Sequence, residues 1–440
     1  MNITRIIWPL AIAFATAIML TPANAQQNSN LPAQDEEVTI IDVVSNYADI
    51  GLASFQDSLK TAEQLRTAIE ELLNNPTDET LELAREAWRT ARIPFEISEI
   101  YMQSNPIVRE WAKRVNAWPI DPDYIDYPGS GFSMAGNDNS SPGKNIIAST
   151  TITVGENTVN VEKITTELIS QKLHMPSGDP TKIASGYQVI EFLLWGNDTS
   201  GAEEKDIEDG AGKRPATDFS IETCTNGNCE RRGEYLYATM NLLIEDLQEM
   251  VGNWLVTGQA RRALLADPEQ GLAMIVSGMG SLALGELAGN RLMRSINVGD
   301  QVAEQDRFSN NTNISYLFNA RGLIGVYFGE YFTMQDEYIA GASMADILEK
   351  NAPELDEEFR VALGFAMARM RLMVEYARDV EAYDLMIAPG NEEGNSLILD
   401  AVSSLVDLSR VIEKFPAALG VEKIEFRRSD QLDGFVSSSE

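Results

Sequence analysis

The stretch of the sequence with most chemical information is SGYQVIEFLLWGNDTS at residues 185–200, where Gln188 and Glu191 stand three positions apart. On a helix this spacing places both side chains on one face. Apolar residues fill most of the other positions, so we expect the helix, and Glu191 with it, to be buried. A buried carboxylate needs an ion, a metal or hydrogen-bond donors to remain charged. The segment therefore predicts either a ligand site or a structural glutamate paired with an arginine, and spacing alone favours the second.

A second chemical segment is WRTARIPFEISEIY at residues 88–101. Arg92 and Glu96 are four positions apart, and Glu96 and Glu99 three. Two carboxylates on one helix face form half of a hard-cation site, as in carboxylate-bridged four-helix bundles. The alternative is a solvated helix face with an ordinary ion pair between residues one turn apart. From spacing alone, the solvated face is the favoured interpretation.

A third segment, SGMGSLALGELAGNRLMRS at residues 277–295, is unusually rich in glycine for a helix. Because each interior glycine destabilises a helix by about 1 kcal/mol relative to alanine, this density predicts a close crossing with another helix. Asn290 and Arg291 are polar groups within the segment and would reach a cleft between two lobes. The oxygen-rich run that follows, residues 299–313, is either a cation-binding loop or, as acidic loops usually are, simply solvated.

Composition excludes several classes of function. The 440-residue chain has 67 acidic and 34 basic residues, a net charge of -33, and one histidine. Nucleic acid binding requires a basic face, which no Lys/Arg-rich stretch provides. A zinc site with two or three histidines cannot be built from His174 alone. A Ser-His-Asp mechanism would depend entirely on this residue, which lies in a polar loop.

The N-terminus has the pattern of a secretory signal peptide spanning residues 1–25. Arg5 precedes an apolar run over residues 6–20, and Ala23-Asn24-Ala25 is a small-x-small cleavage site. The run is too short to span a membrane, and we expect no transmembrane segment in the mature chain. We therefore expect export to the periplasm or cell envelope. An oxidising compartment permits a disulfide between Cys224 and Cys229 in CTNGNC, whose short loop would pin a local turn.

Periodicity along the chain predicts an all-α protein of two helical-bundle lobes with a cleft between them. Helices are expected over residues 40–73, 79–93, 234–254, 268–296 and 357–378, with another inside 396–414, and the only plausible hairpin surrounds residues 155–156. Pro94 is expected to open a further turn. The predicted units are a flexible N-terminus at 26–38, an N-terminal lobe at 39–200, a linker with the disulfide at 201–232, a C-terminal lobe at 233–430 and a tail at 431–440.

Six segments in the same order resemble the imelysin family of exported bacterial proteins, which includes iron-regulated proteins and a proposed insulin-cleaving metallopeptidase. They are WRTARIPFEISEIY, NAWPIDPDYIDY, SGYQVIEFLLWG, CTNGNCERRGEYL, GMGSLALGELAGNRL and GDQVAEQDRFSNNTN. The resemblance implies two helical lobes, possible descent of the lobes from a duplication, and a site in the cleft between them. It also implies a role in iron uptake with envelope partner proteins.

The sequence departs from the family at the residues that matter most. The family signature is G-x-H-x-x-E, with histidine and glutamate as metal ligands, and here glutamine replaces the histidine at Gln188. Histidines are also common in the family where this chain has Gln305 and Asn313. An amide oxygen can bind a hard cation but cannot replace imidazole nitrogen as a ligand. The resemblance thus implies the following site: metal ligands Glu96, Glu99 and Glu191, with Arg92, Gln188, Asn290 and Arg291 binding or positioning the ligand.

Three hypotheses follow, and the sequence ranks them. The first is an exported binding protein that captures a metal ion, a metal complex or a small ligand, with iron or another hard cation favoured by an all-oxygen site. The second is an envelope interaction protein whose ancestral site has decayed. The third and least favoured is a metallopeptidase, because catalytic zinc usually has at least one histidine ligand.

Overall fold

The computed structural model describes residues 37–126, 145–154, 157–180, 182–197, 211–422 and 424–435. Over these ranges helices dominate and the strands are few and short, so the all-α prediction is confirmed. The predicted signal peptide at 1–25 lies outside the described residues, as do most of the segment 26–38, residues 201–210 of the linker and the end of the tail.

The helices of this fold differ widely in length. The longer ones are α1 (Ile40–Asn74), α2 (Asp78–Ile97), α4 (Pro106–Val115), α7 (Tyr187–Trp195), α8 (Cys229–Trp254), α10 (Pro268–Gly280), α12 (Thr312–Phe328), α13 (Met344–Asn351), α14 (Pro353–Asp379) and α16 (Glu392–Ile412). The shorter ones are α3 (Glu99–Ser104), α5 (Pro122–Ile125), α6 (Thr166–Leu168), α9 (Gln259–Leu265), α11 (Arg294–Val298), α15 (Tyr383–Met386) and α17 (Phe415–Leu419). Two π-helical stretches are η1 (Ile169–Leu173) and η4 (Ser281–Met293), and the 3-10 turns are η2 (Pro176–Gly178), η3 (Ala216–Phe219), η5 (Gln301–Ala303) and η6 (Asp430–Leu432). The strands are β1 (Thr151–Val154), β2 (Asn157–Asn160), β3 (Glu330–Phe332) and β4 (Tyr338–Ala340).

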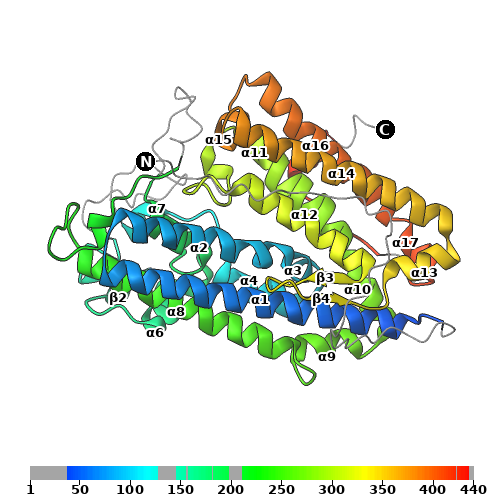
Figure 1. Cartoon of the computed structure of the whole chain (residues 1–440), viewed down its shortest axis with the longest axis horizontal. Coiled ribbons are helices and arrows are strands. Elements are labelled where there is room, and N and C mark those ends of the chain that lie inside the picture. The colour runs from blue at the N-terminus through cyan, green and yellow to red at the C-terminus, as the bar shows by residue number, and fades with distance from the viewer. Residues whose placement is uncertain are drawn as a thin grey trace, which may run out of the picture.

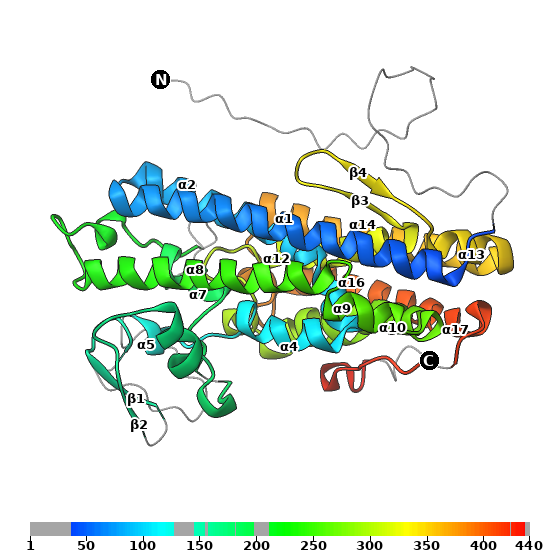
Figure 2. The same ribbon diagram turned by 90° about the horizontal axis from the view of Figure 1, so that it is seen from below.

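One group of helices is built on α1, which packs along both α2 and α8 (Figures 1 and 2). An apolar stripe on α1 that includes Phe55, Leu65 and Ile69 is completely buried, as expected for an amphipathic helix at the core. The short helix α7 fits between α2 and α8. All of its nine residues are buried, so the prediction of a buried helix around Glu191 is confirmed.

A second group of helices consists of η4, α12, α14 and α16, and α12 also packs on α2 (Figure 1). One continuous apolar core runs through both groups. The predicted division into lobes at residues 201–232 remains a prediction. Helix α8 begins inside that segment, at Cys229, and packs mainly along α1, which lies before the predicted linker.

Three local features differ from the sequence-based expectations. Pro94 lies inside α2, so Arg92 and Glu96 belong to one continuous helix. Residues 312–328 form α12, which periodicity does not reveal because its apolar residues are distributed around the whole helix. The structure contains the expected β1–β2 hairpin and also a second antiparallel hairpin, β3–β4, which forms a separate two-stranded sheet.

The glycine-rich segment accommodates more than a helix crossing. A Cβ atom at Gly278 would lie 2.6 Å from Ser104 of α3, which is the close helix contact that the composition predicts. At Gly285 it would lie 2.2 Å from the carbonyl oxygen of Arg427, and at Gly289 2.3 Å from Ser429. These two glycines therefore leave room for the C-terminal segment, which runs along η4 as an irregular chain.

The helical stretch Pro268–Val298 has the length and apolar composition of a membrane span, and no other helix in the described part of the chain does. In its most apolar window, 78% of the residues are buried inside the fold. This burial is typical of the core helix of a folded domain.

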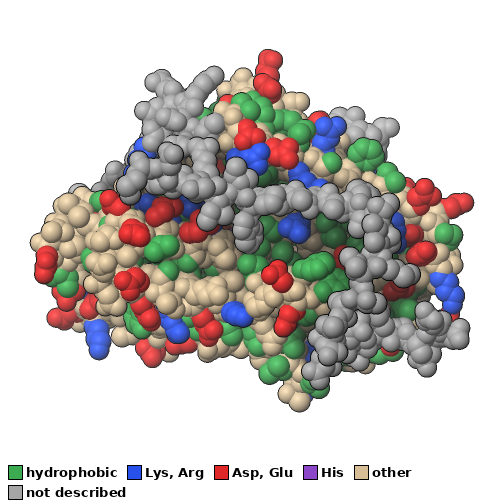
Figure 3. Space-filling model, viewed as in Figure 1, with side chains coloured by type: hydrophobic (Ala, Val, Ile, Leu, Met, Phe, Trp, Pro, Cys, Tyr) green, Lys and Arg blue, Asp and Glu red, His purple; other side chains and the backbone are tan. Residues whose placement is uncertain are grey.

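The surface charge and the disulfide are both as the sequence predicts. Acidic side chains are spread over the visible face and outnumber basic ones (Figure 3). Cys224 and Cys229 form the predicted disulfide, with Cα atoms 5.9 Å apart, and Cys229 is also the first residue of α8. The bond therefore links the loop before α8 to the start of that helix.

Candidate functional site

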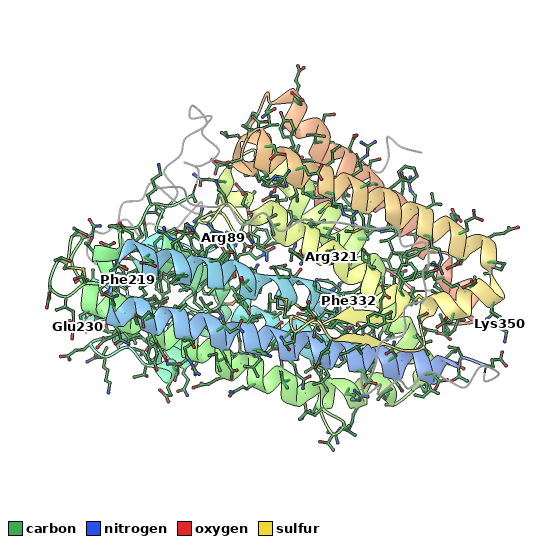
Figure 4. The ribbon with its side chains drawn as sticks, in the orientation of Figure 1. Arg89, Phe219, Glu230, Arg321, Phe332 and Lys350 are labelled. Atoms are coloured by element: carbon green, nitrogen blue, oxygen red, sulfur yellow. A yellow bond between two sulfur atoms is a disulfide. The ribbon has the colours of Figure 1, made fainter. Side chains whose placement is uncertain are left out.

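The site residues from α2, α3 and α7 meet in a buried cluster, which we call the polar centre. Seven chain segments contribute to it: α2, α3, the residue after α4, α7, η4, the loop before α12, and α12 itself. Its members are Arg92, Glu96, Glu99, Asn116, Gln188, Glu191, Arg291, Gln305, Asp306, Ser309 and Asn319. Helices α2 and α12 face each other across this region, and Figure 4 labels Arg89 on the first and Arg321 on the second.

Arg92 organises one side of the polar centre. Its guanidinium binds Asp306 with two nitrogens, Nε–Oδ2 at 3.3 Å and Nη2–Oδ1 at 3.0 Å. A third nitrogen, Nη1, donates to Asn116 Oδ1 at 3.0 Å, and the group also pairs with Glu96. The side chains of Arg92 and Glu96 are 1% and 0% exposed. The interpretation of this pair as a solvated helix face is therefore wrong, because α12 and the loop before it cover α2 here.

Arg291 organises the other side. It donates to Glu99 and to Asn319, binds Gln305 Oε1 at 2.5 Å, and lies 3.7 Å from Glu96 Oε2. Its Nε also bonds Glu286 Oε1 at 3.1 Å, near the edge of the centre.

The predicted ligand residue Asn290, by contrast, is exposed and donates to Glu286 Oε2 at 3.1 Å. The structure therefore brings Arg291 into the polar centre and leaves Asn290 outside it.

Gln188 and Glu191 line the centre from α7. Gln188 Nε2 donates to Asn116 Oδ1 at 2.8 Å and to Asp306 Oδ1 at 3.3 Å. Glu191 Oε1 accepts from the backbone N–H of Ser309 at 2.8 Å and from its hydroxyl at 2.7 Å. The other oxygen of each side chain, Gln188 Oε1 and Glu191 Oε2, is buried and has no hydrogen-bond partner among the described residues. Such buried acceptors are rare in folded proteins and point to a missing water or ion.

The polar centre carries more acids than bases. Four carboxyl groups (Glu96, Glu99, Glu191 and Asp306) face the guanidinium groups of Arg92 and Arg291. Glu304 and Arg307 flank Gln305 and Asp306 in the chain and add one charge of each sign.

Burial among other acidic groups raises the pKa values of the three glutamates of the polar centre. Burial raises the pKa of Glu96 to about 8, and Arg92 opposes the shift only in part. Burial also raises the pKa of Glu99, with Arg291 opposing, and the pKa of Glu191, which Asp306 raises further. The buried glutamates of the polar centre therefore keep their protons to higher pH than exposed glutamates do.

The donor set of the polar centre consists of oxygens. No group of three or more His, Cys, Asp or Glu side chains in the described ranges is arranged to hold a metal ion. The two oxygens without hydrogen-bond partners among the described residues are the amide oxygen of Gln188 and one carboxylate oxygen of Glu191. The amide nitrogen of Gln188 donates to Asp306. His174 lies in a separate pocket beside Arg114 and Asp246. Oxygen ligands of this kind generally prefer hard cations, and the imidazole that zinc sites usually contain lies outside the polar centre.

Asn116 and Asn319 of the polar centre lie outside the segments in which the sequence indicates chemistry, whereas Gln305, Asp306 and Ser309 lie in the oxygen-rich run 299–313. Asn116 connects three members of the centre. Its Oδ1 accepts from Arg92 and Gln188, and its Nδ2 donates to Glu99 Oε1 at 2.9 Å. It begins the segment NAWPIDPDYIDY, so the resemblance contained a signal for it. Asn319 donates to the backbone and side-chain oxygens of Glu96, and it lies on α12, a helix that periodicity does not reveal.

Comparison with known proteins decides the family. The imelysin model (Peptidase_M75) matches residues 51–412 and therefore spans every residue of the polar centre. The chain belongs to the imelysin family. Among solved structures, an iron-regulated protein A precursor from Parabacteroides distasonis ATCC 8503 is similar in fold, with a TM-score of 0.61. That alignment covers 89% of this chain and 98% of the other at 18% identity, and a search of curated proteins finds no match.

Two glutamines of the polar centre stand where the imelysin family has histidine. In this imelysin-family chain Gln188 occupies the position of the signature histidine, and its amide nitrogen already binds Asn116 and Asp306. Gln305, at another position where the family commonly has histidine, donates to Glu96 Oε1 at 3.1 Å. Both glutamines are therefore integrated into the hydrogen-bond network.

Proposed function

We propose that this protein is an exported binding protein of the bacterial envelope that captures a hard cation, alone or in a small complex, at the polar centre. The observation that carries the proposal is the pair of buried oxygens, Gln188 Oε1 and Glu191 Oε2, without hydrogen-bond partners among the described residues. Leaving a buried acceptor unsatisfied destabilises a protein by about 1–3 kcal/mol. A cation that contacts both oxygens would remove that penalty.

The residues have distinct roles in this proposal. Glu191 supplies a carboxylate oxygen and Gln188 an amide oxygen. Asp306 binds Arg92 with both of its carboxylate oxygens and would become a ligand only if that guanidinium group moved. Glu96 and Glu99 are paired with Arg92 and Arg291 and would become ligands only if a guanidinium group moved. Carboxylate and amide oxygens favour Fe³⁺, Ca²⁺ or Mg²⁺ over Zn²⁺ or Cu²⁺.

Iron is the cation that we favour. The similar solved structure is described as an iron-regulated protein A precursor, and the same all-oxygen donor set suits ferric iron. A place in envelope iron uptake, with partner proteins of that system, follows as part of the proposal. Export is supported by the pattern of residues 1–25.

The test is a binding comparison between Glu191→Gln and a matched control. Metal content of the purified protein and titrations with Ca²⁺, Mg²⁺ and ferric citrate would be measured for each variant. Glu191→Gln keeps the size of the side chain and removes its charge, so we expect binding at least about tenfold weaker, which is about 1.4 kcal/mol. Asp57→Asn changes another buried carboxylate, one that binds Tyr331 and the backbone of Met334, and should leave binding unchanged. Equal binding by wild type and Glu191→Gln would exclude Glu191 from the site.

An interaction role is the second candidate, and a surface feature favours it. The outer face of α14 exposes Val361, Phe365 and Leu372 at 53%, 64% and 42%. The first two line a groove of about 710 Å³ between α14 and α16. Large exposed apolar side chains grouped in this way are typical of protein-binding surfaces. Loss of partner binding in Phe365→Ser, with cation binding absent from wild type, would favour this role.

We do not extend the proposal to peptide hydrolysis, although the family model carries a peptidase name. Catalytic zinc usually has at least one histidine ligand and an open position for water. The sole histidine, His174, makes its contacts in the pocket beside Arg114. Chelator-sensitive proteolysis that Glu191→Gln abolishes would contradict this judgement.

A further inference from the structure

His174 connects two chain segments that lead into the polar centre. Its Nδ1 accepts the backbone N–H of Ala184 at 3.2 Å and lies 2.9 Å from the hydroxyl of Ser185. Its Nε2 lies 3.0 Å from the carbonyl oxygen of Lys113. Because Nδ1 accepts a backbone N–H, the proton of the neutral ring belongs on Nε2, which donates to that carbonyl. The neutral imidazole thus bridges the end of α4 and the segment before α7.

Both bridged segments reach the polar centre within a few residues. The Ser185 hydroxyl donates to the carbonyl of Arg114 at 3.0 Å, which adds a second bridge beside the imidazole. One residue further, Gly186 has φ 95° and packs so closely that a Cβ atom would lie 2.5 Å from Val115 O. The two segments then meet in the 2.8 Å hydrogen bond from Gln188 to Asn116. The position of α7 is therefore linked to the contacts of the imidazole by hydrogen bonds, by close packing at Gly186 and by the short stretch of chain from Ser185 to Gln188.

Burial and the charge of Arg114 oppose protonation of the imidazole, whereas the carbonyl of Lys113, which accepts from Nε2, favours it. On α4, Arg114 pairs with Asp246 at 3.0 Å and Glu249 at 2.8 Å, so these two of the three α8 carboxylates in the pocket are already engaged. The ammonium group of Lys113 turns to Glu110 at 2.6 Å. Burial lowers the pKa of His174 and the charge of Arg114 lowers it further, while burial raises the pKa of Asp246 to about 6. Glu245 of α8 and Ser170 of η1 complete the pocket, which has a volume of about 260 Å³ and admits water beside the ring.

We propose that His174 is a positioning residue for the polar centre, whose neutral ring holds α7 in place and whose protonated ring releases it. Protonation places an N–H on Nδ1, which can donate to the hydroxyl oxygen of Ser185 but can no longer accept the N–H of Ala184. The backbone N–H of Ala184 loses its partner, so the segment before α7 is held less firmly and Gln188 and Glu191 lose their fixed position. This inference rests on the proposed function only in its consequence, which is that the polar centre retains its cation less well in acid.

The direction of the pH effect follows from the two states of the ring. In the released state His174 titrates near its ordinary pKa of 6.5, and in the held state its pKa is lower. Release therefore binds a proton, and the held state loses stability as pH falls below about 6.5. At pH 5.5, one unit below the ordinary value, the population of the released state should rise by up to about tenfold.

The first test needs no ligand. Because the chain has a single histidine, one imidazole signal in the NMR spectrum of the purified protein reports its pKa directly. Hydrogen exchange of residues 182–195 would be compared at pH 7.5 and 5.5 after correction for the intrinsic rate. We expect a gain of up to about tenfold in wild type at pH 5.5 and none in His174→Gln. Glutamine cannot titrate, and its amide can accept from Ala184 and donate to Lys113.

Two further variants make this result interpretable. Asp246→Asn removes the other group of the pocket that titrates near pH 6 and should keep the wild-type pH dependence. His174→Ala loses both bonds and should exchange rapidly at either pH. Equal pH dependence in wild type and His174→Gln would overturn the proposal, as would a pKa of His174 at or above 6.5.

The second test separates this inference from the proposed function. Ferric citrate would be titrated into wild type and His174→Gln at pH 7.5 and 5.5, with the variants compared at the same pH so that changes in the iron complex cancel. We expect equal affinity at pH 7.5 and tighter binding by His174→Gln at pH 5.5. If neither protein binds while the exchange difference persists, the proposed function fails and the positioning role of His174 stands. If both bind with the same pH dependence, the positioning role fails.

Discussion

The polar centre and the aromatic cluster beside it are equally buried but are held together by opposite kinds of interaction. The cluster joins α1, α3, α4 and α8 through Phe55, Tyr101, Trp111 and Trp254, with ring centroids of Phe55 and its neighbours 5.7–6.0 Å apart. Its stability comes from apolar burial and dispersion, which do not depend on proton concentration. The polar centre depends on buried charges whose balance changes with pH. Two regions of one core should therefore respond differently to the same treatment.

The largest expected effect comes from removing one arginine from the polar centre. Arg291→Met leaves Glu99 without its arginine and Glu96 with Arg92 alone, and breaking a buried ion pair costs about 3–5 kcal/mol of unfolding free energy. Because the glutamates can take up protons instead, the loss should be smaller at pH 5 than at pH 8. Denaturant unfolding at both pH values measures this difference.

Phe55→Ala is the matched change in the aromatic cluster. A buried phenylalanine replaced by alanine destabilises a protein by about 3–5 kcal/mol, the same range as Arg291→Met. Its loss should be the same at pH 5 and pH 8, and Arg410→Met at the surface should cost little, since Arg410 there pairs with the exposed Asp407. If Arg291→Met were as independent of pH as Phe55→Ala, the two regions would not differ as we describe.

An intermediate effect is expected in the pH dependence of wild-type stability. A carboxyl whose pKa is higher in the folded than in the unfolded protein binds an extra proton when folded, so stability falls as pH rises. For Glu96 this loss should extend from about pH 4.5 to about pH 8. The measurement belongs in the His174→Gln background, because the lowered pKa of His174 acts in the opposite direction below pH 6.5. Glu96→Gln should flatten the slope, and an unchanged slope would remove Glu96 as its source.

The smallest effect on stability is expected when Gln188 is replaced by the histidine of the family signature. Gln188→His is close in size and can still donate one hydrogen bond to Asn116, so stability should change by less than about 1.5 kcal/mol. The imidazole adds a nitrogen ligand beside Glu191, and Zn²⁺ affinity should rise. Zinc titration of both proteins checks this, with Gln305→His as a comparison at another position where the family commonly has histidine. No gain in Zn²⁺ binding would show that the centre is closed to metals whatever occupies position 188.

Most of the fold was predictable because long amphipathic helices have a clear local periodicity. The expected helix at 40–73 corresponds to α1, and that at 234–254 to the greater part of α8. Helix α12 was not predictable in this way, since a helix buried on nearly all sides has no polar face to set its period. The sequence predicts a turn at Pro94 because proline usually ends a helix, yet packing from both sides keeps α2 continuous around it.

For the site, the sequence by itself determined which residues carry the chemistry, and the tertiary structure decided what that chemistry can be. Spacing places Gln188 with Glu191, and Arg92 with Glu96, because residues three or four apart share a helix face whatever the fold. Only the folded chain brings Asp306 and Arg291, which lie 214 and 199 positions after Arg92, into contact with that cluster. Burial in the folded chain, with the nearby carboxylates of Glu99 and Asp306, raises the pKa of Glu96. The same packing leaves two oxygens on α7 without hydrogen-bond partners among the described residues. Side-chain type is local information, whereas desolvation and charge pairing depend on which distant segments cover a group.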